Sequence, residues 1–244
     1  MLGMVTTSDP GTSGIRDIAL AIGGGIKEGS LFIIEGEART GKSVLCQHIA
    51  YGVLNSKGSA VAYYSTDCNS EALLARMDSM SLDARHDFGT DRFRIYKMGT
   101  YHVTQNPVKA IGIIIGHITS LPLRFKLVII DSASSYLARA NSMVKIDFLQ
   151  KCKELCIGER SIVLVMDSYV FEKKSLARAY AMSDYYLKLS SQDMILETGQ
   201  IDTREIKMME VTKLAGAERW QEGIKFEIKP VVGIQIRPFI QVKI

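Results

Sequence analysis

The chain has 244 residues, of which 47% are hydrophobic and 23% are charged, a composition typical of a folded globular protein and far from that of a disordered chain. A chain of this length can bury a core that needs neither disulfides nor a structural metal. Its 30 lysines and arginines against 26 aspartates and glutamates give a net charge of +4. Such a small, mixed excess is a weak argument for binding nucleic acid.

No internal repeat, low-complexity tract or linker rich in proline, glycine and serine divides the sequence, so we predict a single domain over residues 1–244. The longest apolar runs, at residues 111–115 and 127–130, are too short to cross a bilayer, and the N-terminus lacks a signal pattern. These features predict a cytoplasmic protein. The four cysteines contain no C-x-x-C pair, which favours reduced, structural thiols.

Short apolar runs of strand length alternate along the chain with longer segments of helical composition. This alternation predicts an α/β fold with a mostly parallel central sheet flanked by helices on both faces. After about residue 184 the strand-like segments follow one another closely, which predicts an antiparallel C-terminal extension. The first set of strands is expected at residues 31–35, 61–65, 127–130 and 162–166, and the second at residues 185–189, 206–213, 225–228 and 233–236.

The most specific motif is a phosphate-binding loop at residues 36–43, which read GEARTGKS and match the pattern G-x-x-x-x-G-K-[ST]. A predicted strand precedes the loop and a segment of helical periodicity follows it, as such a loop requires. Backbone N–H groups and the start of the helix would bind the β-phosphate of ATP. Lys42 would bridge the β- and γ-phosphates, and Ser43 would bind Mg²⁺. The predicted nucleotide-binding residues of the loop are Gly36, Glu37, Ala38, Arg39, Thr40, Gly41, Lys42, Ser43 and Val44.

A second part of such a site is a carboxylate at the end of an apolar strand. Residues 127–130 read LVII and are followed by Asp131. An aspartate in this position often does no more than turn a strand into a solvated loop. After a phosphate-binding loop, however, we expect Asp131 to contribute to nucleotide binding and to hold Mg²⁺ through a water molecule.

Several short motifs resemble those of a known superfamily. Residues 22–26 read IGGGI, residues 29–31 read GSL and residues 34–37 read IEGE. Together with the phosphate-binding loop, they resemble the entry to the RecA/KaiC-like ATPase core. Motifs at residues 207–213, 216–219, 226–228 and 233–238 look like the closing antiparallel strands of KaiC-like domains. The resemblance covers residues 15–239 and implies a RecA-like P-loop fold that binds ATP.

Within that superfamily, the length of the chain, GKSVL at residues 41–45 and VTKLAGAER at residues 211–219 most resemble the FlaH family, the ATP-binding accessory proteins of the archaeal flagellum (archaellum) motor. The resemblance implies a homo-oligomeric ring, expected to be hexameric, that lies in the cytoplasm and is held at the membrane by the motor complex. The implied partners are the motor ATPase, the membrane platform protein and a cytosolic scaffold.

Hydrolysis needs a group that orients the attacking water, and hydrolysing relatives place a glutamate after the strand that follows the phosphate-loop helix. The only carboxylate at the matching strand end is Asp67, whose side chain is one methylene shorter. A misplacement of about 1 Å can cost roughly 100-fold in rate. Asp67 is therefore a candidate for orienting water, acting through a second water, or alternatively a cap of the helix that begins near Ser70. Glu71 is better placed on that helix than in the site.

KaiC-like rings also insert a Lys-x-Arg pair from the neighbouring subunit. The matching segment here is Lys213-Leu214-Ala215, so the lysine is present and the arginine is missing. An arginine finger is worth about 10³–10⁵ in rate, and its absence argues against fast turnover. Lys213 is a catalytic candidate acting in trans, and alternatively a solvated strand residue.

Two further residues depart from the pattern of the relatives. Asp167 ends the strand at which relatives commonly place a neutral or basic sensor of the γ-phosphate. A second carboxylate there would repel a triphosphate unless Mg²⁺ or a proton compensates, or it could have a structural role away from the nucleotide. Arg39 replaces a frequent glycine of the loop, and it could contact phosphate, contact a neighbouring subunit or be solvated.

The sequence therefore predicts a nucleotide-responsive assembly protein whose hydrolysis is slow or absent. One alternative is a hydrolysing KaiC-like ATPase or autokinase. Another is a RecA-class ATPase acting on DNA, but the segments at residues 132–136 and 169–174 are short and contain no glycine. They do not resemble the flexible basic loops that engage a phosphate backbone.

Overall fold

The computed structural model describes residues 22, 24–56, 58–99, 106–158, 160–195, 201–214 and 223–237, and the elements below lie within these ranges. In chain order the strands are β1 (Leu31–Gly36), β2 (Ala60–Ser65), β3 (Phe93–Lys97), β4 (Phe125–Asp131), β5 (Ser161–Asp167), β6 (Tyr185–Ile195), β7 (Ile201–Lys213), β8 (Ile224–Lys229) and β9 (Gly233–Ile236). The helices are α2 (Lys42–Leu54), α3 (Ser70–Asp78), α4 (Arg85–Gly89), α5 (Pro107–Ser120), α6 (Ser134–Leu137), α7 (Ser142–Ile157) and α8 (Lys173–Met182).

The described strands join in one sheet of order β3-β2-β4-β5-β1-β6-β7-β8-β9. The strands from β3 to β6 run parallel to one another, and β7, β8 and β9 continue the sheet by antiparallel pairing. The predicted α/β architecture, a parallel sheet with an antiparallel extension, is confirmed. Strand β5 lies between β1 and β4 and pairs Gly36 with Asp167, while β2 pairs Ser65 with Asp131. The carboxyl ends of these four strands therefore lie side by side at one edge of the sheet.

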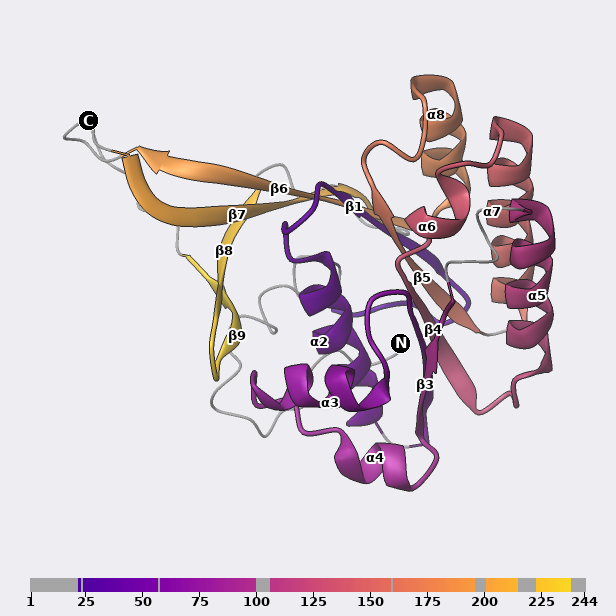
Figure 1. Ribbon diagram of the computed structural model, residues 1–244, viewed down its shortest axis with the longest axis horizontal. Helices are drawn as coiled ribbons and strands as arrows, with labels where there is room; N and C mark the ends of the chain where they lie inside the picture. The colour runs from indigo at the N-terminus through magenta and orange to yellow at the C-terminus, as the bar shows by residue number, and fades with distance from the viewer. Residues whose placement is uncertain are drawn as a thin grey trace.

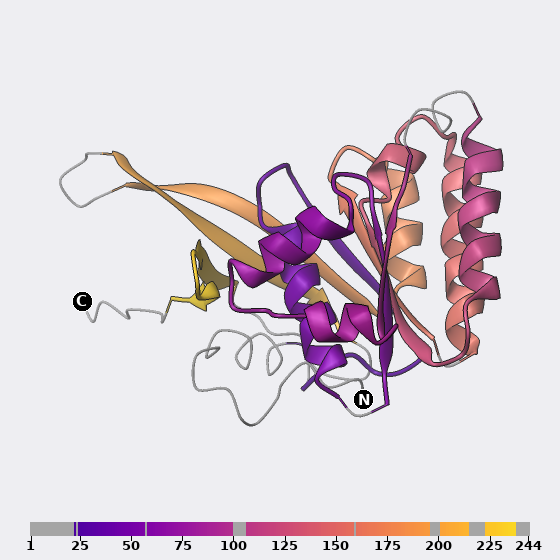
Figure 2. The same ribbon diagram turned by 60° about the horizontal axis from the view of Figure 1, so that its bottom comes forward.

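Helices cover both faces of the parallel strands (Figures 1 and 2). Along β1, Phe32 and Ile34 pack into a cluster with α2 and α3, whereas Leu31 and Ile33 pack into a second cluster with α5, α7 and α8. Because alternate residues of a strand point to opposite faces, a strand covered on both sides is apolar at every position. All six residues of β1 and of β2 are buried, which explains why these strands appear in the sequence as continuous apolar runs.

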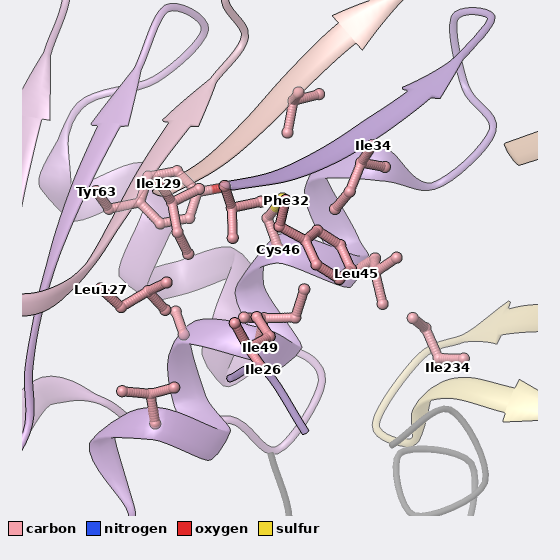
Figure 3. Packing of buried hydrophobic residues seen from close by; sticks show 14 of the residues in the cluster. Ile26, Phe32, Ile34, Leu45, Cys46, Ile49, Tyr63, Leu127, Ile129 and Ile234 are labelled. Carbon is pink, nitrogen blue, oxygen red and sulfur yellow. The ribbon is translucent and has the colours of Figure 1, made fainter. Parts of the chain in front are cut away.

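The antiparallel extension packs on the same side of the sheet as α2. In Figure 3, Ile234 of β9 lies at the border of the cluster that contains Phe32, Leu45 and Ile49. A polar contact supports this packing, because the backbone N–H of Ile234 donates to Nε2 of the buried His48 at 3.1 Å. The strands predicted beyond residue 184 are therefore part of the same core as the phosphate-loop helix.

The sequence prediction missed one strand, β3. Its residues alternate between apolar and polar types, and only Phe93 is buried. Such a strand at the end of a sheet lacks the continuous apolar run by which its neighbours were found. The cysteines agree with the prediction, since Cys46, Cys68, Cys152 and Cys156 are all free and buried. Among the described residues, no helix is long and apolar enough to cross a bilayer.

Candidate nucleotide-binding site

The loop between β1 and α2 has the local geometry of a phosphate cradle. A Cβ atom on Gly36 would lie 2.5 Å from the carbonyl oxygen of Leu189, so the close approach of β6 requires glycine there. Gly41 has φ +95° and provides no side-chain cap for α2. The first N–H groups of a helix have no intrahelical acceptor, and a loop of this form leaves them for an anion. The hydroxyl of Thr40 donates to the carbonyl of Glu37 at 2.9 Å and braces the loop.

The antiparallel extension contacts the outside of this loop. The ammonium group of Lys207 donates to the carbonyl oxygen of Arg39 at 2.7 Å, and a Cβ atom on Gly41 would lie 2.9 Å from Cδ1 of Ile228. Arg39 itself has φ 65° and an exposed side chain. The left-handed backbone explains why glycine suits this position. The contact of Arg39 with phosphate, its contact with a neighbouring subunit and its exposure to solvent alone all stay predictions.

Lys42 is the buried cation at the centre of the site, with 8% of its surface exposed. Its ammonium group donates to the carbonyl oxygens of Gly36 at 2.9 Å and Glu37 at 2.5 Å. It also forms an ion pair with Oδ1 of Asp167 at 3.0 Å. Asp167 thus lies beside the lysine of the phosphate loop, and both interpretations of its role, a carboxylate that faces the triphosphate and a structural residue that does not contact the nucleotide, stay predictions.

The side chains of Ser43, at the start of α2, and Asp131, at the end of β4, are in contact. The hydroxyl of Ser43 donates to Oδ1 of Asp131 at 3.0 Å, and the buried hydroxyl of Tyr63 donates to Oδ2 of the same carboxylate at 2.6 Å. Burial raises the pKa of Asp131, and the charge of Asp67 adds to the increase, whereas the two hydroxyl donors and Lys42 oppose it. The carboxylate is thus buried and held in one orientation by Ser43 and Tyr63.

The donor set fits Mg²⁺ and a phosphate chain. Magnesium prefers oxygen ligands and often takes one or two from the protein and others from phosphate and water. Ser43 and Asp131 supply adjacent oxygens, while Lys42 and the start of α2 supply the positive potential for phosphate. Val44 follows in the first turn of α2 and packs at the margin of the core, and Glu37 and Ala38 are exposed at the mouth of the loop.

Asp67 lies in the turn after β2 with an exposed side chain that accepts a hydrogen bond from the hydroxyl of Thr66 at 3.2 Å. Thr66 also donates its backbone N–H to the carbonyl of Asp131 at 2.9 Å, so the two strand ends are neighbours. The alternative interpretation of Asp67 as a helix cap is wrong, because Asn69 caps α3 by accepting from the N–H of Ala72. The role of Asp67 in orienting water stays a prediction.

Lys213 is engaged on the other side of the sheet. Its ammonium group donates to the carbonyl oxygens of Tyr180 and Ala181 at 2.8 and 3.0 Å, at the end of α8. Helix α8 packs on the face opposite α2, so within one chain Lys213 is held away from Lys42. A catalytic role in trans stays a prediction. Ala215, which stands where the arginine is missing, lies outside the described residues, as does the motif at residues 216–219.

Sequence reasoning missed Tyr63 as a functional residue because it treated the side chain as part of the apolar core. Tyr63 is indeed fully buried, but its hydroxyl reaches Asp131. A usable signal exists, since a tyrosine on a buried strand needs a hydrogen-bond partner. Tyr63 and Ile129 are register partners on β2 and β4, and their strands end at the site.

A parallel sheet whose first strand enters a phosphate-binding loop, with a carboxylate on a nearby strand facing the loop serine, defines a P-loop ATPase of the RecA-like class. A profile of the KaiC ATPase family matches residues 11–239. The chain therefore belongs to the KaiC family of ATPases.

Two curated relatives are both described as archaeal flagellar ATP-binding protein FlaH. The one from Sulfolobus acidocaldarius is 26% identical over 220 residues, which are 88% of this chain and 91% of the relative. The one from Methanocaldococcus jannaschii is 51% identical over 65 residues, 27% of this chain and 28% of the relative.

Solved structures agree on the fold. The crystal structure of the flagellar accessory protein FlaH from Methanocaldococcus jannaschii superposes with a TM-score of 0.78 at 21% identity, covering 98% of this chain and 100% of that one. A KaiC-like protein from Pyrococcus horikoshii gives a TM-score of 0.67 at 17% identity, covering 96% and 100%.

Proposed function

We propose that this protein is an ATP-binding, ring-forming regulatory protein of an archaellum motor complex, in which nucleotide state controls assembly and partner binding and hydrolysis is weak or absent. The observation that carries the binding part is the contact of Ser43 with Asp131 at 3.0 Å beside the buried Lys42. Phosphate and Mg²⁺ need these three groups together. The similarity to proteins named for binding ATP in the archaeal flagellum supports the assignment to that complex.

The catalytic part of the site supports slow turnover. Asp67 is the carboxylate at the end of β2, and its side chain is exposed rather than fixed against the phosphate loop. Lys213 is bound to the end of α8. A protein that binds ATP without consuming it quickly can still act as a switch, because a ligand shifts a conformational equilibrium by its differential affinity for the two states.

The remaining features of the proposal follow the family resemblance. We place the protein in the cytoplasm, as a single ATP-binding domain in a homo-oligomeric ring, against the cytoplasmic side of the motor complex. Its proposed partners are the motor ATPase, the membrane platform protein and a cytosolic scaffold.

Calorimetric titration with Mg-ATP tests the binding part. We expect saturable heat with the wild-type protein and a loss of affinity of at least about 100-fold in Lys42→Ala, because the buried ammonium group is removed from the phosphate site. Lys151→Ala is the matched control, since Lys151 lies on α7 in an exposed ion pair with Asp147. Absence of binding by the wild-type protein, or equal affinity in Lys42→Ala, contradicts the proposal.

Measurements of phosphate release test the proposed slow hydrolysis, and measurements of particle mass test the proposed dependence of assembly on nucleotide. We expect release close to that of Lys42→Ala, and larger assemblies with ATP than with ADP in mass photometry. Rapid, repeated turnover favours instead a hydrolysing KaiC-like ATPase, a candidate supported by the position of Asp67 next to Thr66, whose backbone N–H donates to the carbonyl of Asp131. If Ala215→Arg combined with Asp67→Glu leaves turnover unchanged, the explanation of slow hydrolysis by these two departures is wrong.

A further inference from the structure

The Lys42 ammonium group has three oxygen partners in the structure, two through hydrogen bonds and one through an ion pair. Two of the acceptors are carbonyl oxygens of the phosphate loop itself, from Gly36 and Glu37. The third is the carboxylate of Asp167, which reaches the ammonium group from the end of β5. Because the Asp167 carboxylate already lies beside this ammonium group, a further phosphate oxygen that binds Lys42 has to compete with that carboxylate or lie next to it.

Asp167 is the acceptor that a nucleotide would replace. The carbonyls of Gly36 and Glu37 belong to the loop that forms the cradle, and their positions are fixed by the backbone. The side chain of Asp167 is 22% exposed, so its carboxylate can turn toward solvent. Its backbone is anchored independently, because the N–H of Asp167 donates to the hydroxyl of Ser134 at 2.8 Å. Displacement of the carboxylate therefore needs a side-chain rotation that also gives up its contact with the hydroxyl of the exposed Tyr169.

The position of Asp167 also decides which phosphate competes with it. The loop and the start of α2 enclose the β-phosphate, while the lysine of a phosphate-binding loop extends to the γ-phosphate. Asp167 approaches Lys42 from a strand end outside the loop. The carboxylate and a terminal phosphate thus compete for the same ammonium group. When both are present, two negative groups lie within a few ångströms of each other in a partly buried site.

We propose that Asp167 lowers the affinity of the site for nucleoside triphosphates relative to nucleoside diphosphates, so that occupancy by ATP depends on a high ratio of ATP to ADP. This inference rests on the proposed function, because it assigns a selectivity to the same nucleotide site. The proposed switch then has two states. The Asp167 carboxylate pairs with Lys42 when no terminal phosphate is bound, and a bound terminal phosphate replaces it.

The test is to measure dissociation constants for Mg-ATP and Mg-ADP by calorimetry in the wild type and in Asp167→Asn. Asparagine keeps the size of the side chain and an oxygen acceptor for Lys42 but removes the charge. We expect the ratio of ADP to ATP dissociation constants to rise about tenfold, the change that one screened charge contact can supply, mainly through tighter ATP binding. Asp147→Asn makes the same change of net charge on the exposed surface of α7 and should leave the ratio unchanged.

Asp167→Ser keeps the proposal testable if the asparagine variant folds poorly, and the ratio should rise in it as well. In EDTA the ratio of ADP to ATP dissociation constants should differ more between wild type and Asp167→Asn, because Mg²⁺ no longer offsets the repulsion between the carboxylate and the phosphates. An unchanged or lower ratio in both variants overturns the inference. Failure of the proposed function looks different, since the wild-type protein would then give no binding heat with either nucleotide.

Discussion

The parallel strands and the antiparallel extension belong to one sheet but differ in how the sequence encodes them. Strand β1 is buried at all six positions, whereas in β8 only Ile224 and Phe226 are buried. The difference follows from the helices, which cover both faces of the parallel part, while the strands of the extension keep one side open to solvent. A continuous apolar run and an alternating pattern can therefore belong to the same sheet.

A second difference is that the extension contacts the phosphate loop and the helix that follows it. Lys207 of β7 holds the carbonyl of Arg39, Ile228 of β8 packs against Gly41, and the N–H of Ile234 of β9 binds His48 of α2. Changes in the parallel core that touch neither the phosphate loop nor Asp131 should reduce stability alone, while changes in the extension should also affect the phosphate loop.

The largest effect is expected from truncating a buried aromatic residue in each part. Phe32→Ala, in the centre of β1, should reduce the free energy of unfolding by about 3–5 kcal/mol through lost burial and a cavity. Phe226→Ala should reduce the free energy of unfolding by less, because the strands of the extension are open to solvent on one side. It should in addition weaken nucleotide binding, since Cε2 of Phe226 lies 3.5 Å from the position of a Cβ atom on Gly41. Urea unfolding and Mg-ATP titration measure both. Equal losses of stability with affinity unchanged in both variants would break the comparison.

The contact between α2 and β9 should make stability sensitive to acid. Burial lowers the pKa of His48 from 6.5 to about 4, so between these values the unfolded chain binds a proton that the native protein does not. Stability should therefore be lost as pH falls from about 6.5 toward 4, by up to roughly 3 kcal/mol. Urea unfolding at several pH values tests this, with His48→Gln expected to flatten the profile. The exposed His86→Gln is the control, and an unchanged profile in His48→Gln would refute the assignment.

Substitution of Gly233 tests the contact between α2 and β9 from the side of β9. It has φ +73°, and an added Cβ atom would lie 2.4 Å from Nε2 of His48, whereas Gly58 has φ +78° with open space around it. Gly58→Ala should cost about 1 kcal/mol from backbone strain alone. Gly233→Ala should cost about 2 kcal/mol because the buried imidazole must also move. Thermal and urea unfolding of the two variants separates backbone strain from the clash with His48. Equal losses of stability in both variants would show that β9 can move without disturbing α2.

The smallest change in nucleotide affinity is expected from Tyr63→Phe, which removes only the hydroxyl that donates to Asp131. The loss of one buried hydrogen bond to a carboxylate should cost about 1.5–3 kcal/mol of stability. Because Asp131 would then be held by Ser43 alone, the affinity for Mg-ATP should fall several-fold while the affinity for ATP in EDTA changes little. If both affinities fall equally, Tyr63 acts on the phosphate loop and not on the metal ligand.

Much of the site could be predicted because its parts are local. The loop at residues 36–43 is a contiguous motif, and Asp131 follows an apolar run whose carboxyl end must meet the loop in a parallel sheet. Tyr63 and Asp167 could not be assigned in this way. Their roles depend on the insertion of β5 between β1 and β4 and on which strand ends become neighbours, a property of the topology and not of any short segment.

The class of fold, the phosphate loop and the position of most strands could be predicted from residue patterns, because periodicity and glycine placement are imposed by the local backbone. Three contacts could not be predicted in this way: the ion pair of Asp167 with Lys42, the bonds of Lys213 to the end of α8, and the packing of the extension against the loop. These contacts join residues distant in the chain, and side chains of ordinary type acquire their roles from the neighbours that folding brings to them.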